Sequence, residues 1–341
     1  MMLEDLTNAF GVSGSDNEVK NLILKEITLS ADKIDIMKDG NIIAFKKGRK
    51  TPQKRIMLSA HTDEVGFMVK DITEEGYLEL CEVGGIDSRI LLSKKVYVGD
   101  KKIPGIIGIK AVHMTEKEER EQIIPIEKMY VDIGALSCED AKKYVNRGDY
   151  IVFASEYTPL GKKRAVAKAL DDRVGVSVLI SLLKKEVEYD FYAVFNSLEE
   201  IGLKGAVTAS NSVKPDIALI LEGTTCSDVK DTKAHLISTA LGKGGVLSVG
   251  DRASVSNRKL NEFIVKLSEK YNIPLQLKGT NTGGNDAGAV QISGEGVKTA
   301  VLSVPLRYIH SPVSVMDKDD YESVLKMAEA FVNNIGDFCD D

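Results

Sequence analysis

The hydrophobic pattern of this sequence changes twice along the chain, and that change limits the available folds more than any other feature. Residues 16–27 carry apolar side chains at helical spacing, and a short strand is expected at 55–58. Between about residues 69 and 152 the pattern becomes a series of short β-like runs separated by glycine. After Ala165, amphipathic helical stretches alternate with apolar strand-like runs. This order predicts an α/β domain that is interrupted by a compact β-rich insert.

The expected elements can be placed by residue number. In the insert, β-like runs cover residues 77–80, 95–98, 103–109, 130–133 and 150–153. In the last part of the chain, helices are expected at 172–184, 259–271 and 319–335, with strands at 191–195, 217–221 and 299–304. Such alternation indicates a largely parallel sheet with helices on both faces. The 341 residues suffice for two domains, or for one domain with an insertion.

Two neighbouring carboxylates, Glu199 and Glu200, follow the expected strand at 191–195. The carboxyl end of a buried strand is where an open α/β sheet usually carries its chemistry. Adjacent strand residues point to opposite faces, so both glutamates can serve one site only if the chain turns there. Gly202 favours such a turn. Taken alone, the pair is more often a solvated loop pair.

Imidazoles and carboxylates also stand at other strand ends and helix starts, which strengthens the functional interpretation. The candidate metal ligands are His61, Asp171, Glu200, Glu222 and His310. A mixture of nitrogen and oxygen donors suits zinc, cobalt or manganese, whereas magnesium or calcium would favour an oxygen-only cage. We therefore expect divalent metal ions here, with zinc or cobalt as the first candidates and manganese as an alternative.

These five ligands account for two ions better than for one. With Asp171 as a bridge, His61 and Glu222 complete one ion. Glu200 and His310 complete the other. Each ion then has three protein ligands, which is the open coordination of a catalytic metal, whereas a structural ion is normally closed by four. Paired metals lower the pKa of a shared water and polarise a substrate carbonyl.

Two further carboxylates are expected to support this chemistry. Glu199 is left without a metal and suits the role of general acid/base, because amide hydrolysis needs a base for the water and then an acid for the leaving amine. Asp63, two residues after His61, is expected to hold the imidazole in the required tautomer.

Several sequence blocks resemble the signature blocks of the M42 family of metallo-aminopeptidases. They read S-A-H-T-D-E-V-G at 59–66, A-L-D-D-R-V-G at 169–175, L-E-E-I-G-L-K-G-A at 198–206 and R-Y-I-H-S-P at 307–312. Further matching stretches lie at 11–14, 84–87, 132–135 and 283–288, so the resemblance spans nearly the whole chain. The order and spacing of the blocks are more specific than any single block.

The resemblance implies a zinc-exopeptidase-like mixed sheet flanked by helices, with an inserted small β-barrel domain. It implies a catalytic domain formed by residues 1–67 and 163–341, and an oligomerisation domain formed by residues 68–162. It also implies an aminopeptidase that removes N-terminal residues from peptides through a metal-activated water, with the ligand and acid/base roles given above. Relatives commonly form tetrahedral dodecamers, so a homo-oligomer is expected. The glycine-rich stretch at 283–286 is expected near the substrate.

One position departs from the family pattern and keeps other activities open. Better-known members have aspartate where this chain has Glu222, and in related groups glutamate at that place accompanies carboxypeptidase or deacylase activity. A glucanase is a weaker alternative, because an acid and a nucleophile must flank the substrate and the histidines would then have no role. A nonenzymatic scaffold is disfavoured because every expected ligand position is filled.

Charge and composition narrow the choice of partners. The formal net charge is -6 and no run of Lys or Arg stands out, which argues against nucleic acid or an anionic membrane as a partner. The N-terminus lacks a basic region followed by an apolar stretch, and the four cysteines are widely spaced. We therefore expect a cytoplasmic protein, and the family resemblance implies peptide substrates.

Overall fold

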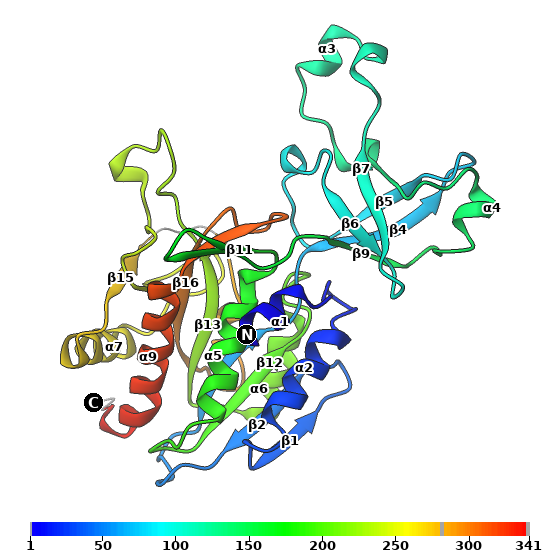
Figure 1. Cartoon of the computed structure of the whole chain (residues 1–341). Coiled ribbons are helices and arrows are strands. Elements are labelled where there is room, and N and C mark those ends of the chain that lie inside the picture. Colours follow the sequence, from blue (N-terminus) through cyan, green and yellow to red (C-terminus); the bar gives the residue numbers. More distant parts are fainter. Residues whose placement is uncertain (1, 280–282, 339–341) are drawn as a thin grey trace.

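The computed structural model describes residues 2–279 and 283–338. The strands among them form two β structures. One is an 11-stranded mixed sheet, and the other is a closed barrel. Figure 1 shows the barrel, coloured cyan to green-blue, standing to one side of the helix-covered sheet. The predicted α/β fold with an inserted small β-barrel is therefore confirmed.

The large sheet has a parallel centre and antiparallel edges. Its main path runs β1 (Lys33–Ile36), β2 (Ile42–Lys46), β12 (Phe191–Asn196), β3 (Ile56–His61), β13 (Ile217–Thr225), β16 (Lys298–Arg307), β17 (Ser314–Asp317), β11 (Arg164–Ala167) and β10 (Thr158–Leu160). Beside this path, β14 (Gly245–Ser248) pairs with β16 and with β15 (Leu275–Lys278). The pairs between β12, β3, β13 and β16 are parallel. The helix and strand alternation predicted this centre, but not the short edge strands, because a mostly exposed strand such as β1 has no apolar run.

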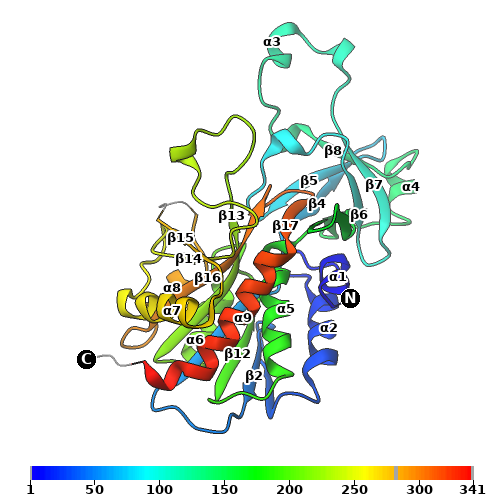
Figure 2. The same ribbon diagram turned by 60° about the vertical axis from the view of Figure 1, so that its left-hand side comes forward.

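Helices cover both faces of the sheet. One face carries α1 (Met2–Asn8), α2 (Asn17–Ile27), α5 (Leu170–Leu183), α7 (Arg258–Tyr271) and α9 (Lys318–Asn334). The other face carries α6 (Lys204–Val213) and α8 (Ala287–Val290). In β3, Ile56 and Leu58 join the larger core while Met57 joins the smaller one. Both faces are therefore buried, which explains the continuous apolar runs of the central strands. Figure 2 shows α5 and α9 side by side on the first face.

The barrel is an antiparallel unit with its own hydrophobic core. Its strands close in the order β4 (Gly66–Ile72), β5 (Leu78–Val83), β8 (Tyr130–Asp132), β7 (Ile103–Gly108), β6 (Lys95–Val98) and β9 (Tyr150–Phe153). Phe67 and Phe153 meet edge to face in this core, with ring centroids 5.8 Å apart. Short helices α3 (Lys117–Arg120) and α4 (Cys138–Ala141) lie in its connections. Since β4 begins five residues after the end of β3 at His61, the barrel branches from the sheet beside the candidate site.

Two local differences from the sequence-based expectations concern site residues. β13 continues to Thr225, so Glu222 lies inside the strand rather than after it, because β16 pairs with it as far as the Thr225 and Leu306 pair. In addition, Asp171 and Asp172 have non-helical backbone angles at the start of α5, and the peptide bond between them is cis. No helix within residues 2–279 and 283–338 is long and apolar enough to cross a membrane.

Candidate metal centre and adjoining pocket

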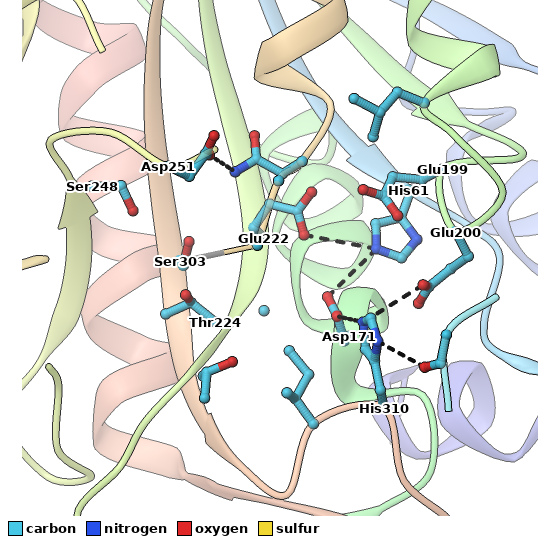
Figure 3. Close-up of a pocket in the computed structure, with 18 of the residues that line it drawn as sticks. His61, Asp171, Glu199, Glu200, Glu222, Thr224, Ser248, Asp251, Ser303 and His310 are labelled. Atoms are coloured by element: carbon cyan, nitrogen blue, oxygen red, sulfur yellow. Dashed lines mark hydrogen bonds and ion pairs between the residues drawn. The ribbon is translucent and has the colours of Figure 1, made fainter. Parts of the chain in front are cut away.

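The five expected metal ligands come together at the carboxyl ends of the central parallel strands. Figure 3 shows the five side chains around one point, with Asp171 between the two imidazoles. His61 lies at the end of β3 and Asp171 at the start of α5. Glu200 lies in the loop after β12, Glu222 inside β13 and His310 in the loop after β16. Chain segments up to 249 residues apart in sequence thus form one cluster, since the parallel strands all end at the same edge.

Asp171 faces both imidazoles, one with each carboxylate oxygen. His61 Nε2 lies 3.4 Å from Asp171 Oδ1 and 3.7 Å from Glu222 Oε2. His310 Nε2 lies 3.3 Å from Asp171 Oδ2 and 3.5 Å from Glu200 Oε2. In each of these two sets of three residues the potential ligand atoms lie within 4.8 Å of one another, and Asp171 belongs to both sets. This is the arrangement that a bridging carboxylate between two ions requires. A third such set, without Asp171, is formed by His61, Glu199 and Glu200.

Backbone carbonyls set the orientation of the two imidazole rings. His61 Nδ1 is 3.0 Å from the carbonyl oxygen of Asp63, and His310 Nδ1 is 3.1 Å from the carbonyl oxygen of Gly85. A carbonyl can only accept a hydrogen bond, so each Nδ1 carries a proton and each Nε2 is turned toward the carboxylates at the centre. Gly85 follows β5, so the barrel contributes directly to the site.

The Asp63 carboxylate holds the segment that carries the two glutamates. Its Oδ1 accepts a hydrogen bond from the amide of Glu199 at 3.1 Å, and its Oδ2 accepts one from the amide of Glu200 at 3.2 Å. Ser13 Oγ donates to Oδ2 as well, at 2.5 Å. Asp63 Oδ1 is 3.6 Å from His61 Nδ1, so the shorter contact that orients the ring comes from the Asp63 carbonyl. Asp63 therefore links the His61 loop to the glutamate turn.

The chain turns at the glutamate pair, as the neighbouring glycine suggested. Leu198 has a φ of 62° and Gly202 a φ of 110°, and both values lie in the left-handed region. Between them Glu199 and Glu200 both line the same pocket, which a regular strand would prevent. The short turn thus explains how two adjacent carboxylates reach one site.

Asp172, which follows Asp171 in the chain, has a different environment. The carboxylate of Asp172 accepts hydrogen bonds from the amides of His61 and Gly175, at 3.2 Å and 2.9 Å. It therefore ties the end of β3 to α5, while Asp171 faces the imidazoles. Neither sequence spacing nor residue type distinguished the two aspartates, because only the backbone angles at the start of α5 separate their directions.

The donor set fits divalent metal ions. His61 Nε2, Asp171 Oδ1 and Glu222 Oε1 are buried and have no hydrogen-bond partner, although buried polar atoms in proteins are almost always paired. The three residues form one group in which potential ligand atoms lie within 4.8 Å of one another. A cation bound between them would supply the missing partner for all three, and nitrogen with carboxylate oxygen is a suitable set for zinc, cobalt or manganese.

The pKa values of the acidic groups also point to missing positive charge. Burial raises the pKa of Glu200 to about 7, and it raises the pKa values of Glu222 and Glu199 well above their usual range. Burial alone would lower the pKa of His310, but the carboxylates of Asp171 and Glu200 outweigh it and raise that pKa to about 9. Several buried carboxylates therefore share one small space, which divalent cations would compensate electrostatically.

A pocket of about 560 Å³ opens beside the cluster. The imidazoles and glutamates form one side of it, and Figure 3 shows Thr224, Ser248, Asp251 and Ser303 on the other side. Lys278 also lines the pocket. Gly283, Gly284 and Asn285 also line it, so three residues of the stretch at 283–286 lie at the pocket. Asp286 is buried behind this wall and accepts a hydrogen bond from Asn196 Nδ2 at 2.8 Å.

Some of these residues were not identified from the sequence. Ser13 lies in the matching stretch 11–14, but a serine 50 positions from its partner gives no local signal of the contact with Asp63. Thr224 lies two residues beyond Glu222 on the same face of β13, and the strand period could have revealed it. Lys278 and Ser248 come from β15 and β14, and neither the pairing of these two strands nor that of β14 with β16 was predicted.

Comparison with known proteins agrees with this geometry. The M42 glutamyl aminopeptidase family model matches residues 40–327. A putative aminopeptidase from Acetivibrio thermocellus is 35% identical, with 96% of each chain covered. The crystal structure of a TET aminopeptidase from the marine-sediment archaeon Thaumarchaeota archaeon SCGC AB-539-E09 superposes with a TM-score of 0.94, at 35% identity, over 98% of this chain and 95% of that one. The TET1 peptidase of Pyrococcus horikoshii gives a TM-score of 0.85 at 34% identity, over 97% and 99% of the two chains.

The fold and the matches define an enzyme of the aminopeptidase class. Within that class, this chain belongs to the M42 glutamyl aminopeptidase family, whose model covers most of its length.

Proposed function

We propose that the chain is a dinuclear-metal-dependent aminopeptidase that hydrolyses N-terminal residues from peptides. The observation that carries the proposal is the position of Asp171, whose two oxygens lie 3.4 Å and 3.3 Å from two different imidazoles. One ion would be held by His61, Asp171 and Glu222. The other would be held by His310, Asp171 and Glu200. Zinc or cobalt is the first choice, with manganese as the alternative.

The ions and the residues around them would have separate roles in the hydrolysis. Bound divalent ions lower the pKa of a water and polarise a carbonyl. Glu199 would take the proton of the attacking water on a carboxylate oxygen and deliver it to the leaving amine. Its side chain lies next to His61 in Figure 3, and its amide is fixed by Asp63. Burial raises its pKa well above the usual range, which makes its carboxylate a stronger proton acceptor.

We also propose that the inserted unit serves assembly. The proposed catalytic domain comprises residues 1–67 and 163–341, and the proposed assembly domain comprises residues 68–162. The Pyrococcus horikoshii TET1 peptidase is described as able to assemble into a tetrahedron or a large octahedral shell. The likeness in fold supports a homo-oligomer for this chain, with a tetrahedral dodecamer as the first form to test by light scattering.

A panel of substrates tests the proposed activity. Aminoacyl anilides and N-blocked controls should be assayed with zinc, cobalt and manganese in turn, before and after chelation. We expect metal-dependent cleavage of the unblocked substrates only. Activity that persists in the fully metal-free protein would refute the proposal.

Glu222 favours one alternative activity, that of a related carboxypeptidase or deacylase. The longer glutamate arm keeps the charge of the usual aspartate but changes the reach of the carboxylate toward His61. If only blocked or C-terminal substrates are cleaved in the same panel, this alternative replaces the aminopeptidase. Glu222→Asp is the matched variant, because it restores the residue found in better-known members of the family.

A further inference from the structure

The largest fully buried side chain among the described residues is a charged one, that of Arg173. Arg173 lies two residues after Asp171, in the first turns of α5, and its exposed fraction is 0%. Burying an arginine is costly unless its donors are paired, because the guanidinium keeps its charge. The partners of Arg173 therefore show which part of the molecule this charge serves.

The guanidinium of Arg173 joins α5 to two other segments of the chain. Its Nε donates a hydrogen bond to the carbonyl oxygen of Thr62 at 3.0 Å, and its Nη2 donates one to Glu64 Oε1 at 3.3 Å. Its Nη1 donates to the carbonyl oxygen of Leu6 at 2.7 Å. Thr62 and Glu64 flank Asp63 in sequence, whereas Leu6 lies in α1. One planar group thus holds the residues on both sides of Asp63 against the N-terminal helix.

A second buried cation reinforces the contact with Glu64. Lys168 Nζ donates to both oxygens of Glu64, at 2.7 Å and 3.0 Å, and to the carbonyl oxygen of Ala9 at 2.7 Å. Glu64 and Lys168 are each 2% exposed. The backbone amide of Glu64 donates to the carbonyl oxygen of Gly11 at 2.8 Å. Charge-assisted hydrogen bonds that are shielded from water therefore fix the segment at 62–64.

The segment at 62–64 carries the groups that orient the candidate centre. The carbonyl oxygen of Asp63 lies 3.0 Å from His61 Nδ1. The carboxylate of Asp63 accepts the amides of Glu199 and Glu200, at 3.1 Å and 3.2 Å. A displacement of this backbone segment would therefore move the His61 ring and the glutamate turn together.

The buried charges also adjoin the candidate ligands. A cavity of about 10 Å³ is lined by Glu64 and Lys168 together with Asp171, Glu200 and His310. Such a volume is about that of one water molecule, so the two groups of side chains are packed closely together. Because packed interiors transmit strain, a shift of these charges would reach the ligands.

We propose that Arg173 is a positioning residue for the hydrolysis. It fixes the segment at 62–64, and through Asp63 it keeps the His61 ring and Glu199 in the geometry that the reaction needs. The inference rests on the proposed aminopeptidase function and adds a residue to it. Arg173 is not among the residues that line the pocket beside the centre, so its effect should fall on kcat rather than on KM.

Arg173→Lys keeps the charge but replaces a fork of donors in three directions by one ammonium. On the zinc-loaded, full-length protein we use the anilide that the wild type cleaves best. We expect kcat per zinc-loaded molecule to fall by about 30-fold, with KM unchanged within about 3-fold. Arg55→Lys is the matched control, because Arg55 Nη1 donates to the carbonyl oxygens of Val213 and Lys214, at the opposite end of β3 from His61.

Gly11→Ala disturbs the same guanidinium while Arg173 itself is kept. A Cβ at this position would lie 2.2 Å from Arg173 Nη2, so the guanidinium must shift within a buried space. We expect kcat to fall by about 5-fold, again with little change in KM. Gly336→Ala is the matched control, because its Cβ would lie 2.1 Å from Tyr189 Oη, in the short helix at 335–337.

Hydrogen exchange followed by mass spectrometry gives a readout that does not depend on turnover. The amides of Glu199 and Glu200 are bonded to Asp63, so a loosened segment at 62–64 should expose them. In Arg173→Lys and in Gly11→Ala we expect exchange in the peptide at 196–204 to be faster than in the wild type by about 10-fold. The two control variants should exchange there as the wild type does.

The outcomes separate a positioning role from a merely structural one. An unchanged kcat per zinc-loaded molecule in Arg173→Lys would overturn the inference and leave the aminopeptidase intact. Faster exchange confined to α1 would also overturn it, because Arg173 would then only anchor that helix. If the wild type cleaves no substrate at all, the proposed function fails, and the exchange at 196–204 alone decides whether Arg173 positions the glutamate turn.

Discussion

The two halves of the candidate metal centre are built from different parts of the fold. The His61 half consists of His61, Asp171 and Glu222, and its histidine and glutamate lie on the central strands β3 and β13. The His310 half consists of His310, Asp171 and Glu200, and its histidine and glutamate lie on loops. The side chain of His61 is 1% exposed, whereas that of His310 is 40% exposed.

This difference shows how rigidity is distributed in the site. Sheet hydrogen bonds fix both strand residues of the His61 half. In the His310 half, the backbone of His310 adopts a φ of 54°, and its ring depends on the Gly85 carbonyl that follows a barrel strand. We expect the His61 half to hold its ion more firmly, and the His310 half to respond to changes in the barrel.

The largest effect is expected from Asp171→Asn, because this residue is shared by both halves. Loss of one negative charge between two cations should remove at least one ion and lower kcat/KM by about 10⁴-fold or more. Metal analysis by mass spectrometry and anilide hydrolysis measure the two consequences. If both ions and activity persist, the bridging role is wrong and the halves are independent.

Glu199→Gln should lower kcat by about 10³-fold and leave both ions in place. The amide keeps the size of the side chain but cannot carry the proton. Glu186→Gln is the control, since Glu186 is an exposed partner of Arg49 and its change should leave the rate unaltered. A loss of metal in Glu199→Gln would instead make Glu199 a ligand, in keeping with its place near His61 and Glu200.

Asp63→Asn tests the link between the His61 loop and the turn that carries Glu199 and Glu200. We expect this change to lower activity by about 10-fold to 100-fold. The carboxylate accepts the amides of Glu199 and Glu200, and an Asn side chain can satisfy only one of them with its single oxygen. Ser13→Ala removes one hydrogen bond to the same group and should cost less. Equal effects of the two changes would show that Asp63 acts through Ser13 alone.

Stepwise removal of metal with a chelator should distinguish the ion of the His61 half from the ion of the His310 half. We expect the two ions to differ in affinity by about 10-fold, with the ion of the exposed His310 half leaving first. Cobalt absorption during titration with a chelator distinguishes the sites, and His310→Ala should remove the weaker step. A single transition for both ions would contradict the structural asymmetry.

The smallest effect is expected from Gly84→Ala, which acts on the His310 half through the barrel. Gly84 has a φ of 80°, and a Cβ would lie 2.8 Å from Val65 Cγ1, so the Gly85 carbonyl must shift. We expect the affinity of the weaker ion to fall by about 3-fold to 10-fold, as for a strain of about 1 kcal/mol. Gly148→Ala is the matched control, since Gly148 has a φ of 87° with open space around it. An equal change in both variants would point to general strain.

Much of the fold was predictable because it depends on local patterns. The expected strand at 150–153 coincides with β9, and the helix at 259–271 matches α7 within one residue. Strands without an apolar run, such as β1 and β10, were missed because edge positions do not require burial. The end of β13 was misjudged because its last residues are held by pairing with β16 rather than by their own hydrophobicity.

The sequence by itself determined which residue types stand at the ends of the central strands, and so the family and the candidate ligands. Only the tertiary structure shows what separates Asp171, already chosen as a ligand, from its neighbour: Asp171 faces two imidazoles, whereas Asp172 accepts hydrogen bonds from backbone amides. It alone brought the Gly85 carbonyl to His310 and the Lys278 ammonium to Thr224. The physical reason is that residue identity and periodicity are local, whereas the direction of a side chain and the balance of buried charge depend on segments that meet only after folding.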